Sequence, residues 1–237
     1  MKISKTLEYD LGANVRAFTT THEVDARRTN PLPLSDLSGL PLERIIIPHQ
    51  VHDTRCLLID DAFLQLSSDE QKERLECIDA VITHLPDTLL CISTADCIPV
   101  IIYDTIHHAV ANIHAGWKGT VQRIVEKTFL QMQQTFGTQG KDCHAVIGPG
   151  ISLESFEVGD EVYERFSSAG FDMQSIAKRF QKWHINLPLC NQHQLIHCGI
   201  PKQNIYTAPI CTFKDNNYYS ARREGTETGR NMTCIQL

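Results

Sequence analysis

The sequence predicts a single α/β domain that spans residues 1–237, and three observations lead to this fold class. Short apolar runs of strand length recur along the chain, and several of them end in a cluster of polar residues. The apolar residues of 121–132 recur at the spacing of one helix face. No repeat, low-complexity tract or linker divides the chain, and a hydrophobic fraction of 42% suffices for a sizeable core.

Composition excludes several classes of function. The net charge of −6 gives no general reason to bind nucleic acid or an anionic membrane. No apolar run approaches the roughly 18 residues of a membrane span, and the first residues lack the apolar region of a secretory signal. Nine cysteines are odd in number, scattered and free of any C-x-x-C pair, which argues against a disulfide framework and a zinc ribbon. We therefore expect a cytoplasmic protein in a reducing environment.

The first fifty residues are predicted to hold a hairpin, a loop and a buried strand. Residues 6–21 alternate apolar and polar positions around a turn at Gly12-Ala13-Asn14. Residues 23–43 are largely polar and broken by three prolines, which predicts a loop. Three consecutive isoleucines in 44–47 predict a short buried strand, and the polar group His49-Gln50-Val51-His52 follows it directly.

The stretch from Ile92 to Gly119 is the most informative part of the chain, because it contains two polar clusters that follow strand-like runs. One cluster is Thr94-Ala95-Asp96-Cys97, and the other begins at His114. An α/β sheet presents its ligand-binding groups at such strand ends. Cys97 and His114, delivered by neighbouring strands, could therefore meet in space. The strands predicted here are 89–92, 98–103 and 109–113.

A helix over 121–132, ended by Gly137, is the clearest helical prediction. It would begin just beyond His114 and Lys118, so its N-terminal amides would point toward the same polar edge and could bind an anion. The remaining predicted elements are a surface segment with a helical turn at 60–75, strands at 79–83, 145–148, 204–207, 217–220 and 232–235, and helices at 161–166 and 189–198.

His52, Cys97 and His114 form a candidate catalytic metal site of two imidazoles and one thiolate. Zinc accepts these ligands tetrahedrally, and three protein ligands leave one position for water or substrate. Eleven histidines and nine cysteines also make chance combinations easy, so a buried Cys97 that packs as a small apolar residue is the simpler alternative. His49 could replace His52, since the spacing does not distinguish them. Cys97 with His114 as its base, oriented by Asp96, would equally suit a thiol nucleophile.

Basic residues near these clusters are candidate anion ligands. Lys118 lies between Gly116 and Gly119, where glycine allows a ligand to approach the backbone. Arg222 and Arg223 offer guanidinium groups for phosphate or carboxylate. For an isolated arginine pair, a solvated loop is the simpler interpretation.

The motifs of this chain resemble those of the YfiH family, which is also called laccase-domain or polyphenol oxidase-like. The similarity runs in order from Ala17-Phe18-Thr19-Thr20 to the C-terminus. Its most specific parts are the ADC and HAGW motifs around Cys97 and His114. The other matching motifs are Gln50-Val51-His52, Ile147-Gly148-Pro149-Gly150-Ile151, Phe156-Glu157-Val158-Gly159 and Tyr219-Ser220-Ala221-Arg222-Arg223.

The resemblance implies a single-domain α/β/α layered sandwich with a mixed sheet and a zinc site, copper being the alternative metal. The implied ligands are His52, Cys97 and His114. The implied reactions are phosphorolysis of adenosine, inosine, guanosine and methylthioadenosine, together with adenosine deamination. Purine nucleoside and phosphate would thus be the ligands.

If the protein is such a nucleoside phosphorylase, the chemistry of nearby residues suggests further roles. Lys118, Arg222 and Arg223 could hold phosphate near the sugar carbon, and Asp96 is the expected general acid or base. A Cys97/His114 amidohydrolase, a copper-dependent phenol oxidase and an interaction protein with a vestigial site are the alternatives. A true multicopper laccase is disfavoured, because the sequence contains no H-x-H motif.

Four departures from the family pattern leave the metal ligands intact but bear on substrate preference. Asp53 follows His52 where the family has glycine, and Lys118 replaces an arginine. The usual SYRRDG reads SARREG, and a usual aspartate before the late helix is Asn186.

Overall fold

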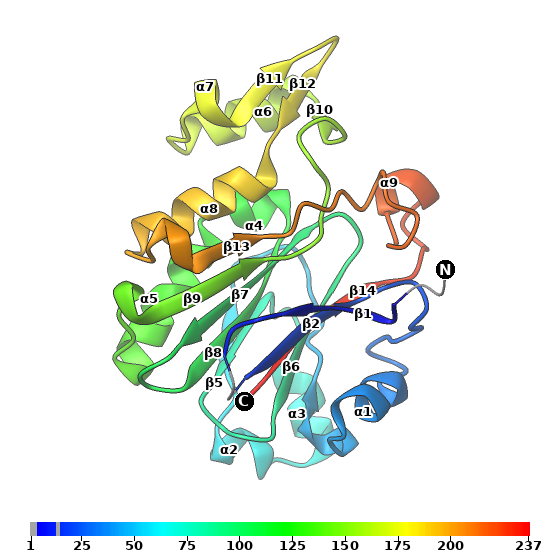
Figure 1. Ribbon diagram of the computed structural model, residues 1–237, viewed down its shortest axis with the longest axis vertical. Coiled ribbons are helices and arrows are strands. Elements are labelled where there is room, and N and C mark those ends of the chain that lie inside the picture. Colours follow the sequence, from blue (N-terminus) through cyan, green and yellow to red (C-terminus); the bar gives the residue numbers. More distant parts are fainter. Residues whose placement is uncertain (1–3, 13–14) are drawn as a thin grey trace.

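In the computed structural model, which describes residues 4–12 and 15–237, two large β-sheets lie face to face and helices cover their outer faces (Figure 1). Both sheets mix parallel and antiparallel pairs. The predicted α/β class is therefore confirmed, with its strands divided between two stacked sheets.

The six-stranded sheet has the order β13-β9-β7-β8-β5-β4. The outer strands β4 and β13 pair in parallel with their neighbours, and the inner pairs are antiparallel. Every residue of β7 and β8 is buried, because both faces of this sheet are covered. Its strands are β4 (Cys56–Leu58), β5 (Ala80–Thr83), β7 (Ile98–Asp104), β8 (Ala109–Ala115), β9 (Cys143–Ile147) and β13 (Ile205–Thr207).

The five-stranded sheet has the order β1-β2-β14-β6-β3 and includes the C-terminal strand. The predicted N-terminal hairpin is confirmed as the antiparallel pair β1 and β2, although Ala13 and Asn14 of its turn lie outside the described residues. The strands are β1 (Thr6–Tyr9), β2 (Arg16–Thr20), β3 (Ile45–Ile46), β6 (Leu89–Thr94) and β14 (Asn231–Gln236).

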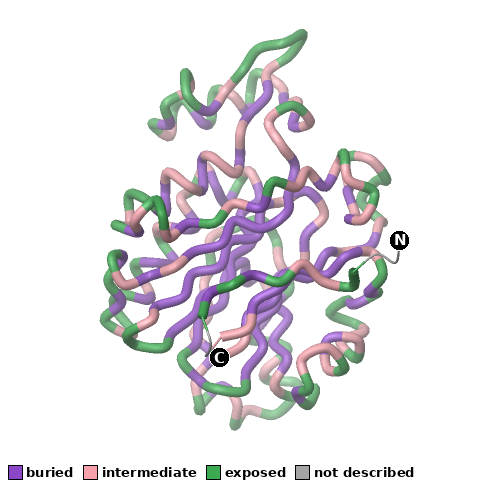
Figure 2. The backbone as a smooth tube through the Cα atoms, viewed as in Figure 1, coloured by how far each residue is buried: buried purple, intermediate pink, exposed green. Residues whose placement is uncertain are grey.

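The core has three apolar layers, and the middle one joins the two sheets. Figure 2 shows that the strands of both sheets are largely buried. In that layer, Leu90 and Ile235 of the five-stranded sheet belong to one cluster with Ile101, Val110 and Val146 of the six-stranded sheet. These side chains alternate with those that face the helices, so both faces of each inner strand are apolar. This accounts for the continuous apolar runs in the sequence.

Helices α4 (Trp117–Val121), α5 (Ile124–Phe136) and α8 (Leu187–His197) belong to the cluster on the outer face of the six-stranded sheet. The prediction of one helix over 121–132 misses its break, because Arg123 has a φ of 64° and separates α4 from α5. At this break, the side chain of Gln194 in α8 donates a hydrogen bond to the Thr120 carbonyl at 3.0 Å. The helix beside Lys118 is thus only one turn long.

The predicted loop at 23–43 is wrong where α1 (Leu32–Ser38) forms. Pro31 is its N-cap and Pro33 lies in its first turn, where the missing N–H of proline costs no hydrogen bond. Leu34 of α1 packs on the outer face of the five-stranded sheet.

The predicted strand at 217–220 is also wrong. The Asn231 side chain accepts from the Tyr219 N–H and donates to its carbonyl, each at 2.9 Å. These two bonds satisfy the backbone that a strand partner would otherwise engage. The segment leads into α9 (Ala221–Glu224).

A small arm extends beyond the sheets at the top of Figure 1. Its antiparallel sheet has the order β10-β12-β11, and it also carries two helices. The elements are β10 (Glu157–Val158), α6 (Asp160–Ser168), α7 (Met173–Ile176), β11 (Ala177–Arg179) and β12 (Trp183–Ile185).

Two short helices, α2 (Asp61–Leu64) and α3 (Ser68–Arg74), follow β4 and confirm the helical surface segment predicted there. Among the described residues, no helix is long and apolar enough to cross a membrane.

Candidate metal centre

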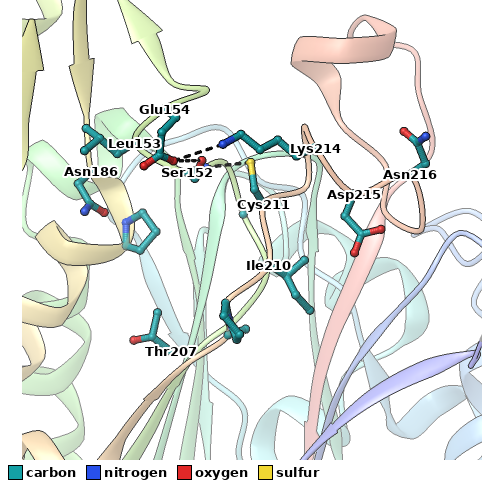
Figure 3. Close-up of a pocket in the computed structure, with 14 residues that line it drawn as sticks. Ser152, Leu153, Glu154, Asn186, Thr207, Ile210, Cys211, Lys214, Asp215 and Asn216 are labelled. Atoms are coloured by element: carbon teal, nitrogen blue, oxygen red, sulfur yellow. Dashed lines mark hydrogen bonds and ion pairs between the residues drawn. The ribbon is translucent and has the colours of Figure 1, made fainter.

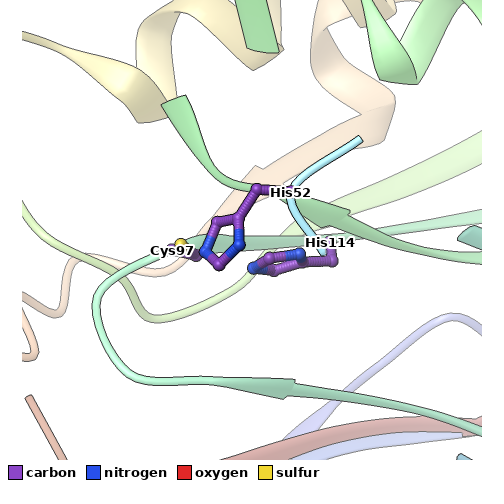
Figure 4. A group of neighbouring side chains, drawn as sticks. All are labelled: His52, Cys97 and His114. Carbon is purple, nitrogen blue, oxygen red and sulfur yellow. The ribbon is translucent and has the colours of Figure 1, made fainter. Parts of the chain in front are cut away.

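Three side chains from separate parts of the chain converge at one end of the central strands of the six-stranded sheet (Figure 4). His114 is the penultimate residue of β8, Cys97 directly precedes the adjacent β7, and His52 lies in the loop after β3. One ligand atom from each lies within 4.8 Å of the others. The two imidazole rings have centroids 4.8 Å apart at an interplanar angle of 71°.

These residues line a cavity of about 380 Å³. His114 is buried, Cys97 is partly exposed and His52 is exposed, so the cluster faces an open cavity. A small ligand could therefore reach it from solvent. The lining residues are Arg28, Pro48, His49, Gln50, His52, Ser93, Thr94, Ala95, Cys97, His114, Ala221, Thr226 and Arg230.

Asp79, which sequence reasoning did not single out, links both imidazole ligands. Its fully buried Oδ1 lies 2.8 Å from His114 Nδ1. Its two oxygens also accept the backbone N–H groups of Val51, His52 and Asp53 at 2.9–3.2 Å. A carboxylate that engages one imidazole nitrogen leaves the other for a metal. The only signal in the sequence was an acidic residue at the start of a buried strand.

His52 lies in a strained turn that the side chains of Asp79 and Gln50 stabilise through hydrogen bonds. Its φ of 65° lies in the left-handed region, which non-glycine residues rarely adopt. The Asp79 carboxylate accepts from the amides on both sides of this turn. Gln50, two residues before His52, is held to β6, since its side-chain amide donates to the Ser93 carbonyl and accepts from the Ser93 N–H and hydroxyl, each at 2.9 Å.

Electrostatics favour a thiolate in this cluster. Burial would raise the pKa of Cys97, but His114 and His52 outweigh it and lower the pKa to about 6. Burial likewise opposes the charge of His114, while Cys97 and Asp79 raise its pKa to about 9. Asp79 keeps a pKa below its ordinary value despite burial, because His114 and the backbone amides donate to it. Metals bind the thiolate form of cysteine.

Gly116 lies directly against the cluster, and its lack of a side chain leaves space for the ligand groups. A Cβ at this position would lie 2.9 Å from His52 Cδ2 and 3.0 Å from Cys97 Sγ. Only glycine therefore leaves the three ligand groups undisturbed. Two imidazoles and one thiolate are a donor set that zinc accepts, and copper also binds such groups.

Asp96 lies close in sequence but serves a different set of contacts. Its φ of 88° is left-handed, and it is buried. Its Oδ1 accepts from the Thr212 hydroxyl and its Oδ2 from the Arg222 N–H, each at 2.7 Å. The carboxylate thus joins the loop before Cys97 to the segments that carry Thr212 and Arg222.

The three predicted phosphate ligands do not line the cavity. Lys118 is exposed, with its Nζ 5.9 Å from the Trp117 ring centroid. The Arg222 guanidinium donates to the Glu157 carbonyl at 3.0 Å. Every guanidinium nitrogen of Arg223 already bonds within the protein, mainly to carbonyls of residues 212–218.

Arg28 and Arg230 are the arginines that line the cavity. Arg230 lies seven residues after Arg223 in the sequence, and Arg28 lies in the predicted loop. Neither position carried a motif that would have identified it.

A second cavity, of about 700 Å³, lies between the β9 end, α8 and the segment after β13 (Figure 3). Ser152, Glu154, Cys211 and Lys214 are among the residues that line it. Asn186 also lines the cavity, and its Oδ1 caps α8 by accepting the Leu189 N–H at 3.0 Å. Asparagine is among the residues preferred at this capping position.

Comparison with known proteins matches residues 11–237 to the family described as multi-copper polyphenol oxidoreductase laccase. A purine nucleoside phosphorylase of Bacteroides thetaiotaomicron is 47% identical over 215 residues, which cover 89% of this chain and 79% of that protein. A protein named adenosine deaminase RL5, from an unknown prokaryotic organism, is 37% identical over 90% of this chain and 80% of its own length.

Among solved structures, the Bacillus licheniformis protein YfiH superposes with a TM-score of 0.83 at 25% identity. The match covers 94% of this chain and 92% of that one. Family model, relatives and fold agree over nearly the whole length. The chain therefore belongs to the multi-copper polyphenol oxidoreductase laccase family, in which the YfiH proteins lie.

Proposed function

We propose that this protein is a metal-dependent purine nucleoside phosphorylase with adenosine deaminase activity. The observation that carries the proposal is the cluster of His52, Cys97 and His114 at a cavity, in a chain 47% identical to a purine nucleoside phosphorylase. The relative named as an adenosine deaminase supports the second activity. Adenosine, inosine, guanosine and methylthioadenosine are the proposed substrates.

His52, Cys97 and His114 would hold a zinc ion, with copper as the alternative. When bound, zinc supplies Lewis acidity to substrate atoms beside it. Asp79 orients His114 through Nδ1 and holds the turn that carries His52. Such partners of metal ligands typically change metal affinity or activity by about 10- to 100-fold when removed.

Phosphorolysis also requires an anion site near the sugar carbon, and Arg28 and Arg230 are our candidates because they line the cavity. An arginine fork can hold phosphate through two parallel hydrogen bonds. Lys118, Arg222 and Arg223 stay alternative phosphate ligands, as does Asp96 as a proton-transfer group. The engaged carboxylate of Asp96 is better suited to positioning the loop before Cys97.

We expect adenosine or inosine to be split to free base and ribose 1-phosphate only when phosphate is present. Arg28→Ala should raise the phosphate concentration needed by about 10- to 100-fold, which corresponds to one lost charge-assisted contact. Arg27→Ala changes an exposed arginine that does not line the cavity, so it is the matched control and should change this concentration little. Chromatography of the products measures both effects. Base release that ignores phosphate, or none from any purine nucleoside, would refute the proposal.

A second candidate is thiol chemistry, because Cys97, His114 and Asp79 form a row of thiol, imidazole and carboxylate. Hydrolases activate a nucleophile with this order of groups. As an amidohydrolase, the protein would keep the Cys97 thiolate free. As a metal-dependent phosphorylase, it would commit that thiolate to the metal.

A further inference from the structure

Arg28, Glu76 and His49 form a chain of contacts at the cavity. The Glu76 carboxylate lies between Arg28 and His49, with Oε1 2.5 Å from Arg28 Nη2 and Oε2 2.6 Å from His49 Nδ1. Arg28 and His49 both line the cavity that holds His52, Cys97 and His114. Glu76 thus connects two cavity residues that are 21 positions apart in the sequence.

The backbone of His49 is fixed on both sides. Its N–H donates to the Leu75 carbonyl at 2.9 Å, and its carbonyl accepts from the Ile78 N–H at 3.0 Å. His49 and Glu76 also form an isolated parallel β-bridge. The imidazole is therefore held at the cavity by backbone contacts as well as by its side-chain partner.

The contact with Glu76 engages one ring nitrogen of His49, Nδ1. The hydrogen bond from Arg28 holds the pKa of Glu76 below its ordinary range, so this carboxylate is ionised at neutral pH. An ionised carboxylate only accepts hydrogen bonds, so His49 Nδ1 carries a proton. Nε2 is then the nitrogen left to interact with a ligand.

His49 also stands alone chemically among the described residues that line this cavity. His52, Cys97 and His114 form the candidate metal cluster, and arginine does not release its proton in proteins. The other lining side chains are apolar groups, hydroxyls and one amide, which are poor proton donors near neutral pH. His49 is thus the lining side chain suited to give a proton to a bound substrate.

We propose that His49, positioned by Glu76, is the general acid that protonates the purine as it leaves the sugar. This inference rests on the proposed phosphorylase function. As a phosphate oxygen bonds to the sugar C1′, the C1′–N9 bond breaks and its electron pair enters the purine ring. The proton on His49 Nε2 moves to N7 of the purine, and solvent later reprotonates the imidazole. Glu76 stabilises the imidazolium before the transfer.

A substrate that needs no such proton provides the test. In 7-methylguanosine, N7 carries a methyl group and a positive charge, so the base leaves without protonation there. We expect His49→Gln to lower kcat/KM for guanosine by about 100- to 10,000-fold, the range of general acid catalysis. The same variant should split 7-methylguanosine within a few-fold of the wild-type rate.

Two further variants and a metal measurement complete the experiment. His197→Gln changes a side chain that is 78% exposed on α8 and should leave both substrates unaffected. Glu76→Gln should show the same selective loss as His49→Gln, but smaller. Zinc content should be unchanged in each variant, which separates proton transfer from metal loss.

The outcomes distinguish this inference from the function on which it rests. If the wild-type protein splits neither nucleoside in phosphate, the phosphorylase proposal fails and the role of His49 fails with it. If the wild-type protein is active but His49→Gln affects both substrates equally, or neither, only the role of His49 is overturned.

Discussion

At the scale of single residues, Gly116 has the most direct effect on the candidate metal centre. A side chain there would press against His52 and Cys97, yet the backbone φ of −64° suits any residue. We expect Gly116→Ala to fold but to lower zinc affinity by at least about 10-fold, as for other disturbances around metal ligands. Elemental analysis of the purified variant measures the loss.

Gly39 provides the matched control for this substitution. It has a φ of 75°, and a Cβ there would meet no atom within 4 Å. Gly39→Ala should therefore cost about 1 kcal/mol of stability through its left-handed backbone and keep its metal. If Gly116→Ala retains as much zinc as Gly39→Ala, the close approach of Gly116 to the ligands has no bearing on the site.

Residue chemistry also determined which site groups the sequence could predict. Cys97 and His114 were predictable as a pair because each adjoins the end of a long apolar run. Asp79 could not be predicted, because its role depends on tertiary structure. It directly precedes β5, whose neighbours are the parallel β4 and the antiparallel β8, and its carboxylate contacts both residues 51–53 and His114. Arg28 and His49 are linked through Glu76, which lies far from both in the sequence, and local patterns do not encode such a contact.

At the scale of elements, Asp104 fixes the turn between the two central strands β7 and β8. Its buried carboxylate accepts from the amides of Ile106 and His107 and from the His107 ring at 2.8–3.1 Å. Burial raises the pKa of Asp104, but these bonds outweigh it, so the pKa lies below its ordinary value of 3.8. The folded state thus binds this proton less readily than the unfolded chain.

The sign of the pH effect follows from linkage. The ionised carboxylate stabilises the fold above the ordinary pKa, and this contribution is lost as pH falls below about 4. We expect Asp104→Asn to lower the free energy of unfolding by about 1–3 kcal/mol at pH 7, and the difference to narrow below pH 4. Denaturant unfolding of the wild type and the variant at pH 7 and below pH 4 measures this difference in the free energy of unfolding. A gap that stays constant with pH would show that the charge of Asp104 contributes nothing.

The predictability of the elements depended on their length and on their partners. Long strands buried on both faces, such as β7 and β8, were predicted because sheet packing requires an apolar run. The arm sheet was missed, since β10, β11 and β12 have only two or three residues each. The break at Arg123 was missed because the hydrogen bond that accompanies it comes from Gln194 in α8, which is far away in the sequence.

At the scale of the whole molecule, the candidate site depends on both sheets. His52 follows β3 of the five-stranded sheet, whereas Cys97 and His114 adjoin β7 and β8 of the six-stranded sheet. The apolar layer between the sheets joins these parts. We propose that residues 1–237 act as one domain for this reason, since separating the sheets would separate the ligands.

The state of the Cys97 thiol tests this account most directly. Freshly purified protein is treated with iodoacetamide, and the labelling rate of each cysteine is measured by peptide mass spectrometry before and after addition of a chelator. Cys211 is an internal control in the same chain, because it lies in the second cavity and its thiol is partly exposed. Burial raises the pKa of this thiol, but hydrogen bonds outweigh burial and lower the pKa. We expect Cys97 to label slowly until the chelator removes the metal, while Cys211 labels equally under both conditions. Rapid labelling of Cys97 in the untreated protein would contradict a metal held by His52, Cys97 and His114, and would favour the thiol nucleophile.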